Sequence, residues 1–178
     1  VEGDKSGAYL RYKVEEGQVL LFKVAISYTS IENARHNLEA ELPHWDFDRV
    51  VDDSKNVWND WLGRMAVEGG TEAQRIKYYT DLWRSLLGRR MISDVGGTYT
   101  DNTGPEPVIR QIPKGPDGKP THNHYNSDAF WGARWGIGLV WSLGYPDTMN
   151  QFVNSLLDMY QNGGLIPRGP SGGNYTFV

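Results

Sequence analysis

The sequence predicts an α+β chain with extended segments at its start and helices after them, and three observations support this fold class. Residues 20–28 alternate between apolar and mixed positions, which is the period-2 pattern of a strand with one buried face. From residue 29 onward, apolar residues recur every three or four positions, as they do along one face of a helix. Breaks that contain Gly and Pro separate the helical runs and are typical of turns.

The composition is that of a globular chain. Of 178 residues, 39% are hydrophobic and 22% are charged, so neither disorder nor a membrane span is indicated. The net charge of -4, without a cluster of Lys and Arg, argues against a nucleic-acid partner. The absence of Cys excludes disulfides and Cys-zinc sites but leaves the compartment open. No signal peptide is visible, and the chain closes inside a Gly-rich stretch, so we expect a fragment of a longer protein.

Two strands are expected before residue 29. A short strand at residues 10–14, a turn at residues 15–18 and a longer strand at residues 20–28 together predict a β-hairpin. Because an isolated hairpin is marginally stable in water, we expect these strands to belong to a larger sheet.

Three helices are expected in the middle of the chain. Thr29 and Glu32 fit a capping box for a helix that Pro43 ends. A second helix covers residues 46–63, with a carboxylate suited to its N-terminus and two Trp residues that we interpret as core residues. The third covers residues 71–88 and begins with a second capping box, formed by Thr71 and Gln74.

Two more helices follow a long segment without periodicity. That segment, residues 89–127, exceeds the usual limit of about 12–15 residues for a loop, so it is either functional or disordered. A helix at residues 128–143 and another at residues 147–161 are joined by a tight Gly-Tyr-Pro turn, which implies antiparallel neighbours. Two glycines after Asn162 end the last helix.

The alternation of helix directions predicts which loops meet. If the last three helices run up, down and up, the long segment and the residues after Gln161 emerge at the same end. The polar residues brought together in this way are Asp94, His122, His124, Asp128, Arg168 and Asn174. Convergent polar groups between aromatic side chains are typical of a site for a polar ligand, and a carbohydrate suits the mixture of carboxylate, guanidinium, amide and aromatic groups.

Several of these residues have a second interpretation. His122 and His124 could ligate a metal, but no third ligand is evident, and a structural or surface role is the alternative. Asp94 and Asp101 are candidate acid or base carboxylates, or else turn-forming residues. No Ser-His-Asp order, phosphate loop or nucleotide fingerprint is present.

Asp128 and Arg168 also have two interpretations each. Asp128 either stabilises the first turn of a helix or contacts a ligand. Arg168 has Pro167 before it and Gly169 after it, a rigid frame that would aim a guanidinium into a cleft. A solvated loop arginine is the alternative.

Five stretches together resemble one known family. Residues 26–41, residues 58–64 (Trp-Asn-Asp-Trp-Leu-Gly-Arg), the helix around residues 79–83, residues 93–99 (Ser-Asp-Val-Gly-Gly-Thr-Tyr) and residues 152–164 carry this resemblance. In these residues and in their order, the chain resembles glycoside hydrolase family 92, the exo-acting, calcium-dependent, inverting α-mannosidases. The resemblance covers nearly the entire chain.

The resemblance implies a domain organisation. Residues 1–28 would be the C-terminal strands of an N-terminal β-sandwich domain, and residues 29–45 would be a linker helix. Residues 46–178 would be the first helical hairpins of a catalytic (α/α)6 barrel, truncated at the C-terminus. The family's general acid Glu and general base Asp are expected beyond Val178, as are most calcium ligands, so no catalytic residue is expected in this chain and the fragment alone is expected to be inactive.

The resemblance also implies binding residues. Asp128 and Phe130 match the family's Trp-Asp-Thr-Phe-Arg motif, whereas Gly96 and Tyr175 replace family carboxylates, which suggests a divergent subgroup. The residues predicted to bind substrate are Asp128, Phe130, Trp131, His124, Arg168 and Asn174.

The expected function is removal of terminal α-linked mannose from glycans. The resemblance implies calcium as cofactor, a mannoside substrate, the remainder of its own polypeptide as partner, and a periplasmic, cell-surface or secreted location. Two alternatives are a non-catalytic glycan-binding or structural relative and an (α/α)6 glycosidase acting on another sugar.

Overall fold

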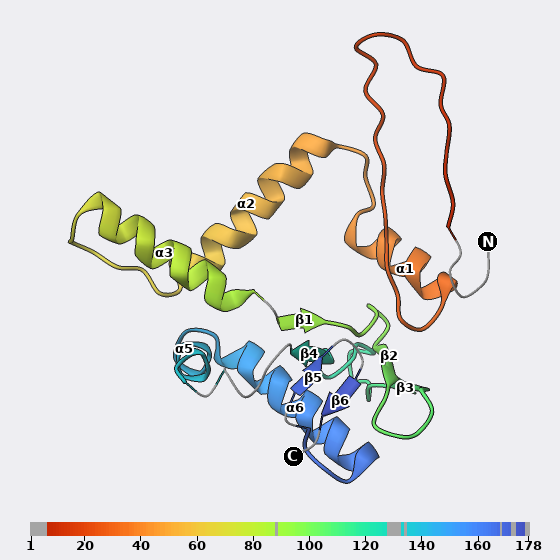
Figure 1. Cartoon of the computed structure of the whole chain (residues 1–178), viewed down its shortest axis with the longest axis vertical. Coiled ribbons are helices and arrows are strands. Elements are labelled where there is room, and N and C mark those ends of the chain that lie inside the picture. The colour runs from red at the N-terminus through yellow and green to blue at the C-terminus, as the bar shows by residue number, and fades with distance from the viewer. Residues whose placement is uncertain are drawn as a thin grey trace.

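The computed structural model describes residues 7–87, 89–127, 133, 135–167, 169–171 and 174–176, and within them the chain is α+β, as predicted. The helices are α1 (Ile31–Glu41), α2 (Phe47–Gly63), α3 (Glu72–Leu86), α5 (Ile137–Gly144) and α6 (Pro146–Gly163) (Figure 1). The strands are β1 (Arg89–Met91), β2 (Thr98–Asp101), β3 (Val108–Gln111), β4 (Tyr125–Ser127), β5 (Gly169–Ser171) and β6 (Asn174–Thr176).

The strands form three small antiparallel pairs among the described residues: β1 with β4, β2 with β3, and β5 with β6. Strands β1 and β4 stand at the two ends of the segment for which the sequence predicts no periodicity. Their pairing, with Arg90 opposite Asn126, closes this segment into an ordered loop. Short strands of three or four residues carry too few side chains to produce a period-2 pattern, which is why the sequence does not reveal them.

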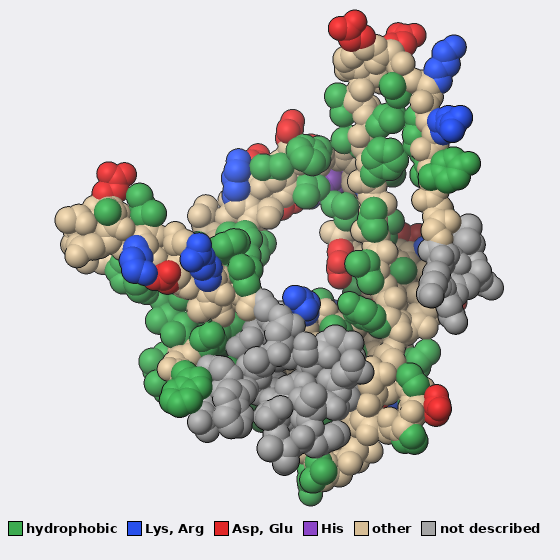
Figure 2. Space-filling view, viewed as in Figure 1, with side chains coloured by type: hydrophobic (Ala, Val, Ile, Leu, Met, Phe, Trp, Pro, Cys, Tyr) green, Lys and Arg blue, Asp and Glu red, His purple; other side chains and the backbone are tan. Residues whose placement is uncertain are grey.

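The predicted N-terminal hairpin is a turn between two extended limbs and not a pair of strands. No strand is present within residues 7–28, although Gly17 (φ +80°) and a hydrogen bond from the Gln18 amide to the Glu15 carbonyl at 3.1 Å form the expected turn. Hydrophobic side chains lie exposed along both limbs, as Figure 2 shows, and Val24 is 83% exposed. The predicted hairpin pairing is therefore wrong within residues 7–28, and the assignment of these limbs to a larger sheet stays a prediction.

Helix α1 starts one residue later than the capping box predicts. The N-cap is Ser30, whose hydroxyl accepts from the Asn33 amide at 3.0 Å. Thr29 instead donates its hydroxyl to a carboxylate outside the helix, that of Asp94. The predicted Thr29–Glu32 box is therefore wrong, because the threonine is used for a tertiary contact.

The starts of α2 and α3 match their predicted signals. The Asp46 carboxylate accepts from the Arg49 amide at 3.0 Å, and Thr71 with Gln74 forms the reciprocal capping box. Both helices thus begin within one residue of the predicted positions.

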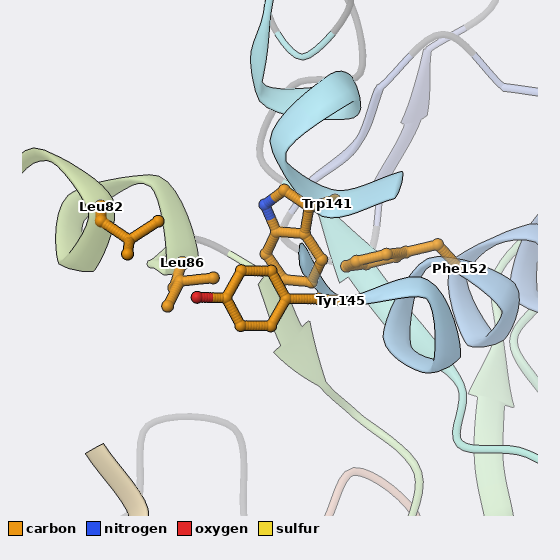
Figure 3. Close-up of a cluster of buried hydrophobic side chains, with 5 residues drawn as sticks. All are labelled: Leu82, Leu86, Trp141, Tyr145 and Phe152. Carbon is orange, nitrogen blue, oxygen red and sulfur yellow. The ribbon is translucent and has the colours of Figure 1, made fainter. Parts of the chain in front are cut away.

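The core lies where α3, α5 and α6 meet. Leu82 and Leu86 of α3 face Trp141, Tyr145 and Phe152, which come from α5, the turn after it and α6 (Figure 3). The rings of Trp141 and Phe152 make an edge-to-face contact with centroids 5.0 Å apart. Such aromatic pairs contribute about 0.5–1.5 kcal/mol beyond the area that they bury.

The polar ends of these aromatic residues are also satisfied. The Trp141 indole donates to the Ser85 carbonyl at 3.1 Å, and the Tyr145 hydroxyl donates to the Trp61 carbonyl at 2.9 Å. Trp58 and Trp61 are partly buried against the same cluster, which confirms their interpretation as core residues. These contacts attach α2 to the helices that follow it.

Helices α5 and α6 follow each other through the short turn at Tyr145 and contact each other, as predicted. They are not an antiparallel pair, since Figure 1 shows α5 end-on and α6 from the side. Pro146 occupies the first turn of α6, and Gly164 (φ +80°) caps its C-terminus in the left-handed region, where glycine is favoured. Of the helices in the described part of the chain, none is long and apolar enough to cross a membrane.

Candidate functional site

A carboxylate on α6 holds the two histidines that the sequence singles out. The Asp158 Oδ2 atom lies 2.8 Å from His122 Nε2 and 3.2 Å from His124 Nδ1. The histidines belong to the segment that leads into β4, so one oxygen atom of α6 attaches this segment to the helix.

The protonation of this cluster follows from its hydrogen bonds. Burial raises the pKa of Asp158, but the hydrogen bonds from His124 and His122 outweigh it, so the pKa lies below its ordinary value. An ionised carboxylate only accepts hydrogen bonds, so both imidazoles must donate to it. For a neutral His124 this places the proton on Nδ1 and leaves Nε2 as an acceptor. Nε2 is buried and has no hydrogen-bond partner among the described residues.

An aromatic ring covers His124. Tyr99 of β2 stacks on the imidazole with centroids 4.0 Å apart and planes at 17°. Burial, together with the nearby Asp158 charge, raises the pKa of Tyr99 to about 12, so the phenol remains neutral. Its oxygen accepts from the Asn162 side chain at 3.1 Å. His124 itself is 0% exposed, so its imidazole lies in the interior rather than on a surface.

The backbone of the same segment is held from two sides. On one side, the Ser155 hydroxyl of α6 accepts from the Tyr125 amide at 2.9 Å. On the other, the Ser93 hydroxyl accepts from the His124 amide at 3.0 Å, and the Ile92 amide donates to the His124 carbonyl at 2.9 Å. The start of β4 is thereby fixed between α6 and the chain after β1.

The other predicted substrate-binding residues lie directly after β4 or beside the last two strands, β5 and β6. Strand β4 ends directly before Asp128, and it contacts β5, which begins directly after Arg168 (Figure 1). The end of the long segment and the chain after α6 therefore meet, as the sequence predicts, although the helix directions assumed for that prediction are not those of an antiparallel pair. Asp128, Phe130, Trp131 and Arg168 themselves lie outside the described residues. Asn174 opens β6 opposite Ser171, and its side chain lies outside the described part.

Asp94 has a structural environment. Its carboxylate, 4% exposed, accepts from Thr29, from Asn37 Nδ2 at 2.8 Å and from Thr98 Oγ1 at 2.8 Å. Burial raises the pKa of Asp94, but these hydrogen bonds outweigh it and the net shift is downward. Asp94 thus attaches α1 to the chain between β1 and β2 rather than acting as a proton donor.

The carboxylate of Asp101 is also buried and hydrogen-bonded within the protein. It accepts from Arg110 Nε at 2.6 Å and from the Thr103 amide at 3.0 Å, and it is 3% exposed. Burial raises its pKa, and the bonds from Arg110 and Thr103 lower it below the ordinary value. The turn-forming interpretation therefore holds for the Asp101 carboxylate, which bonds to Thr103 two residues on, whereas the Asp94 carboxylate makes tertiary contacts with α1.

The described residues do not form a metal site. Within the described ranges, no group of three or more His, Asp or Glu side chains is arranged to hold an ion. Calcium prefers six to eight oxygen ligands, and the carboxylates of Asp94, Asp101 and Asp158 are all engaged in internal hydrogen bonds. This part of the chain alone does not fit a calcium cage.

Asp158 and its helical neighbours are absent from the sequence-based site. The signal that would have revealed them is a polar stripe on an otherwise core-forming helix, made of Gln151, Ser155, Asp158 and Asn162. Because a helix advances about 100° per residue, these four positions share one face.

Comparison with known proteins identifies relatives. A family model for the glycosyl hydrolase family 92 catalytic domain matches residues 33–178. An uncharacterized secreted glycosidase of Arthroderma benhamiae is 25% identical over 89 residues, which cover 47% of this chain and 12% of that protein. The solved structure of the gh92 family glycosyl hydrolase ccman5 superposes with a TM-score of 0.64 at 22% identity, over 85% of this chain and 19% of that one.

The chain thus spans only a small part of the length of these relatives. The family match covers most of the chain and includes every described element after the start of α1. The chain therefore belongs to glycoside hydrolase family 92.

Proposed function

We propose that the full-length protein removes terminal α-linked mannose from glycans, by an inverting and calcium-assisted hydrolysis. The observation that carries this proposal is the family match over residues 33–178. The names of the relatives, a glycosyl hydrolase and a secreted glycosidase, agree with a glycan substrate.

The described residues support a polar-ligand site. His124 Nε2, Asn126 Oδ1 and Gln151 Oε1 are buried acceptors without a hydrogen-bond partner among the described residues. Buried polar atoms are normally paired, and hydroxyl groups of a sugar or ordered water would supply the donors that these atoms lack. His124 and Asn126 lie directly before and within β4, shortly before Asp128 in sequence, and Gln151 lies on α6.

The proposed binding residues have distinct roles. The Asp128 carboxylate would accept from mannose hydroxyls, while Phe130 and Trp131 would cover the apolar C–H face of the ring. Arg168 and Asn174 would donate hydrogen bonds from the adjoining segment, and the buried His124 would support the site from beneath.

The reacting groups would come from the rest of the polypeptide. An inverting glycosidase needs one carboxylic acid to protonate the leaving oxygen and one carboxylate to activate water on the opposite face of the sugar. We assign neither role to a residue of this chain. Calcium, when bound, would help to position the sugar and the water. A periplasmic, cell-surface or secreted location is part of the proposal and can be checked by cell fractionation.

The test uses the full-length protein. Release of mannose from α-linked disaccharides is measured with and without a calcium chelator, and with α-glucosides as the matched control. The first anomer formed is identified by proton NMR. We expect β-mannose, no release from the glucosides, and loss of activity on chelation that added calcium restores.

The other outcomes separate the alternatives. Binding of glycans without release favours a non-catalytic relative, and release from another glycoside favours a different sugar. Mannose release that is unaffected by chelation contradicts the calcium-assisted mechanism, and release of α-mannose first contradicts inversion.

A further inference from the structure

Residues 20–42 contain the second extended limb and helix α1, and Figure 1 shows α1 on the side of the molecule away from α5. We infer that this segment, called the strap below, is held on residues 94–100 by hydrogen bonds rather than by an apolar core. It separates from them as a unit, with residues 43–46 as the hinge. The inference is independent of the sugar that the full-length protein cleaves.

The joint between the strap and residues 94–100 is polar. Its described hydrogen bonds join Thr29 to Asp94, Asn33 to Thr98, Asn37 to Asp94 and Val95, and the Tyr28 carbonyl to Thr100. Each of these bonds uses at least one side chain, so none is part of a helix or a strand ladder. The joint can therefore open without breaking secondary structure.

The strap adds nothing to the hydrophobic core of the described chain. Asn37 is the only buried residue in the range 20–42, and Ile31 of α1 is 63% exposed. The apolar cluster of α3, α5 and α6, with the residues packed against it, includes no residue of the strap among the described ones. Because apolar burial is the main favourable term in folding, the core does not depend on the strap.

The strap is also loosely packed against its neighbours. A cleft of about 610 Å³ lies between residues 24–28, α1 and residues 90–94, and another of about 300 Å³ lies between the end of α1 and α2. A cooperative interior is packed as densely as a crystal, with few voids larger than a water molecule. Polar contacts beside open clefts are instead typical of interfaces between parts that move relative to each other.

Within the strap, the limb and α1 are attached to each other. Lys23 Nζ donates to the Leu42 carbonyl at the end of α1, at 2.8 Å, and Asn37 Nδ2 donates to the Ile26 carbonyl at 3.2 Å. Residues 43–46 lie outside both α1 and α2, so their backbone can absorb a rotation. These contacts favour motion of the strap as one body.

The position of the strap in the chain gives this motion a consequence. The family model begins at residue 33, so the strap spans the start of the matched catalytic domain. When the strap separates from residues 94–100, the polypeptide before residue 20 can change its orientation relative to that domain.

Native-state hydrogen exchange of the full-length protein tests the inference at three amides. The Val95 amide donates to Asn37 Oδ1 across the joint, so it reports separation. The Leu38 amide lies in the middle of α1 and reports unfolding of that helix. The Tyr145 amide donates to the Trp141 carbonyl at 2.9 Å and reports opening of the core.

Two variants weaken the joint without removing the partner of the Val95 amide. Asn33→Ala removes the hydrogen bond to Thr98, and Thr29→Val removes the bond to the Asp94 carboxylate while keeping the shape of the side chain. Asn56→Ala is the matched control, because Asn56 is an exposed asparagine within α2.

We expect exchange at the Val95 amide to accelerate on the order of 3- to 30-fold in Asn33→Ala and on the order of 10- to 100-fold in Thr29→Val. The second effect is larger because a hydrogen bond to a charged group contributes more than one between neutral groups. Exchange at Leu38 and Tyr145 is expected to stay within twofold of the wild type in both variants, as should all three amides in Asn56→Ala.

Three results overturn the inference. If Tyr145 accelerates in step with Val95, the strap belongs to the folding unit of the core. If Leu38 accelerates in step with Val95, α1 unfolds instead of separating. If Val95 stays within twofold of the wild type in either variant, the hydrogen bonds of the joint open independently and the strap is not one unit.

Discussion

Asp94 is the clearest place at which to test how α1 is attached to the rest of the chain. Its buried carboxylate accepts hydrogen bonds from three side chains, those of Thr29, Asn37 and Thr98. Asp94→Ala removes all three acceptor contacts at once. The matched control is Asp81→Ala, because Asp81 is an exposed carboxylate paired with Lys77.

The magnitude follows from the contacts. A hydrogen bond to a charged group contributes about 1.5–3 kcal/mol, so three sum to about 4.5–9 kcal/mol. Removing the carboxylate also removes the several kcal/mol that burying its charge costs. Asn37 keeps a second acceptor, the Ile26 carbonyl at 3.2 Å. We therefore expect the free energy of local opening to fall by about 2–4 kcal/mol, and by less than about 0.5 kcal/mol in the Asp81 control.

Native-state hydrogen exchange measures this directly at the Val95 amide. That amide donates to Asn37 Oδ1 at 3.0 Å, so it is protected only while α1 is docked. A loss of about 2–4 kcal/mol corresponds to roughly 30- to 1000-fold faster exchange. Exchange that accelerates by less than threefold in Asp94→Ala would falsify the assignment of Asp94 as the residue that holds α1.

Three further predictions concern acid stability and two glycines. The folded-state pKa of Asp158 lies below its unfolded value, so its ionisation stabilises the fold above about pH 3.9, and this contribution is lost as the pH falls through the folded pKa. Asp158→Asn should therefore flatten the fall in Tm below about pH 4, and an unchanged acid limb contradicts this. Gly144→Ala would place a Cβ 2.6 Å from the Met65 sulfur, whereas a Cβ at Gly63 meets nothing within 4 Å. Urea unfolding should show a loss of about 1–3 kcal/mol for Gly144→Ala and no loss for Gly63→Ala, and equal effects refute the packing argument. Gly164→Ala, at φ +80°, should cost about 1 kcal/mol of stability in the same assay, and a neutral result shows that the cap does not constrain α6.

The elements that the sequence predicts well are those whose signals are local. The capping box at Thr71 and Gln74, the carboxylate cap at Asp46 and the αL glycine at Gly164 all involve side chains or backbone within one turn of the helix end. Such signals need no knowledge of the tertiary structure.

The predictions that fail depend on distant partners. Thr29 is at a position where the sequence predicts an N-cap, but its hydroxyl donates to Asp94, which is 65 residues away in the chain. The strands β1 and β4 exist because they pair with each other across the long segment, and no three-residue stretch carries that information. The predicted strands at the N-terminus have the right pattern, but the described residues contain no layer for them to pack on.

In the candidate site too, local patterns are visible in the sequence, whereas contacts between distant residues are not. The histidine pair is visible in the sequence as a His-Asn-His stretch, and the strand that follows it contacts the segment after α6, as predicted. Its carboxylate partner, Asp158, is not visible as such, because the sharing of one oxygen by two imidazoles depends on how α6 is rotated about its axis.

The rotation of α6 also limits how this protein can change during evolution. The helix presents Phe152 and Met159 to the interior and Asp158 to the histidines, from one continuous run of residues. Inserting or deleting one residue between Phe152 and Asp158 would turn the following residues by about 100° relative to Phe152. The carboxylate would then leave the histidines while an apolar side chain replaced it. Substitutions along α6 can be accommodated one at a time, but this stretch of α6 cannot change in length without separating the core from the site.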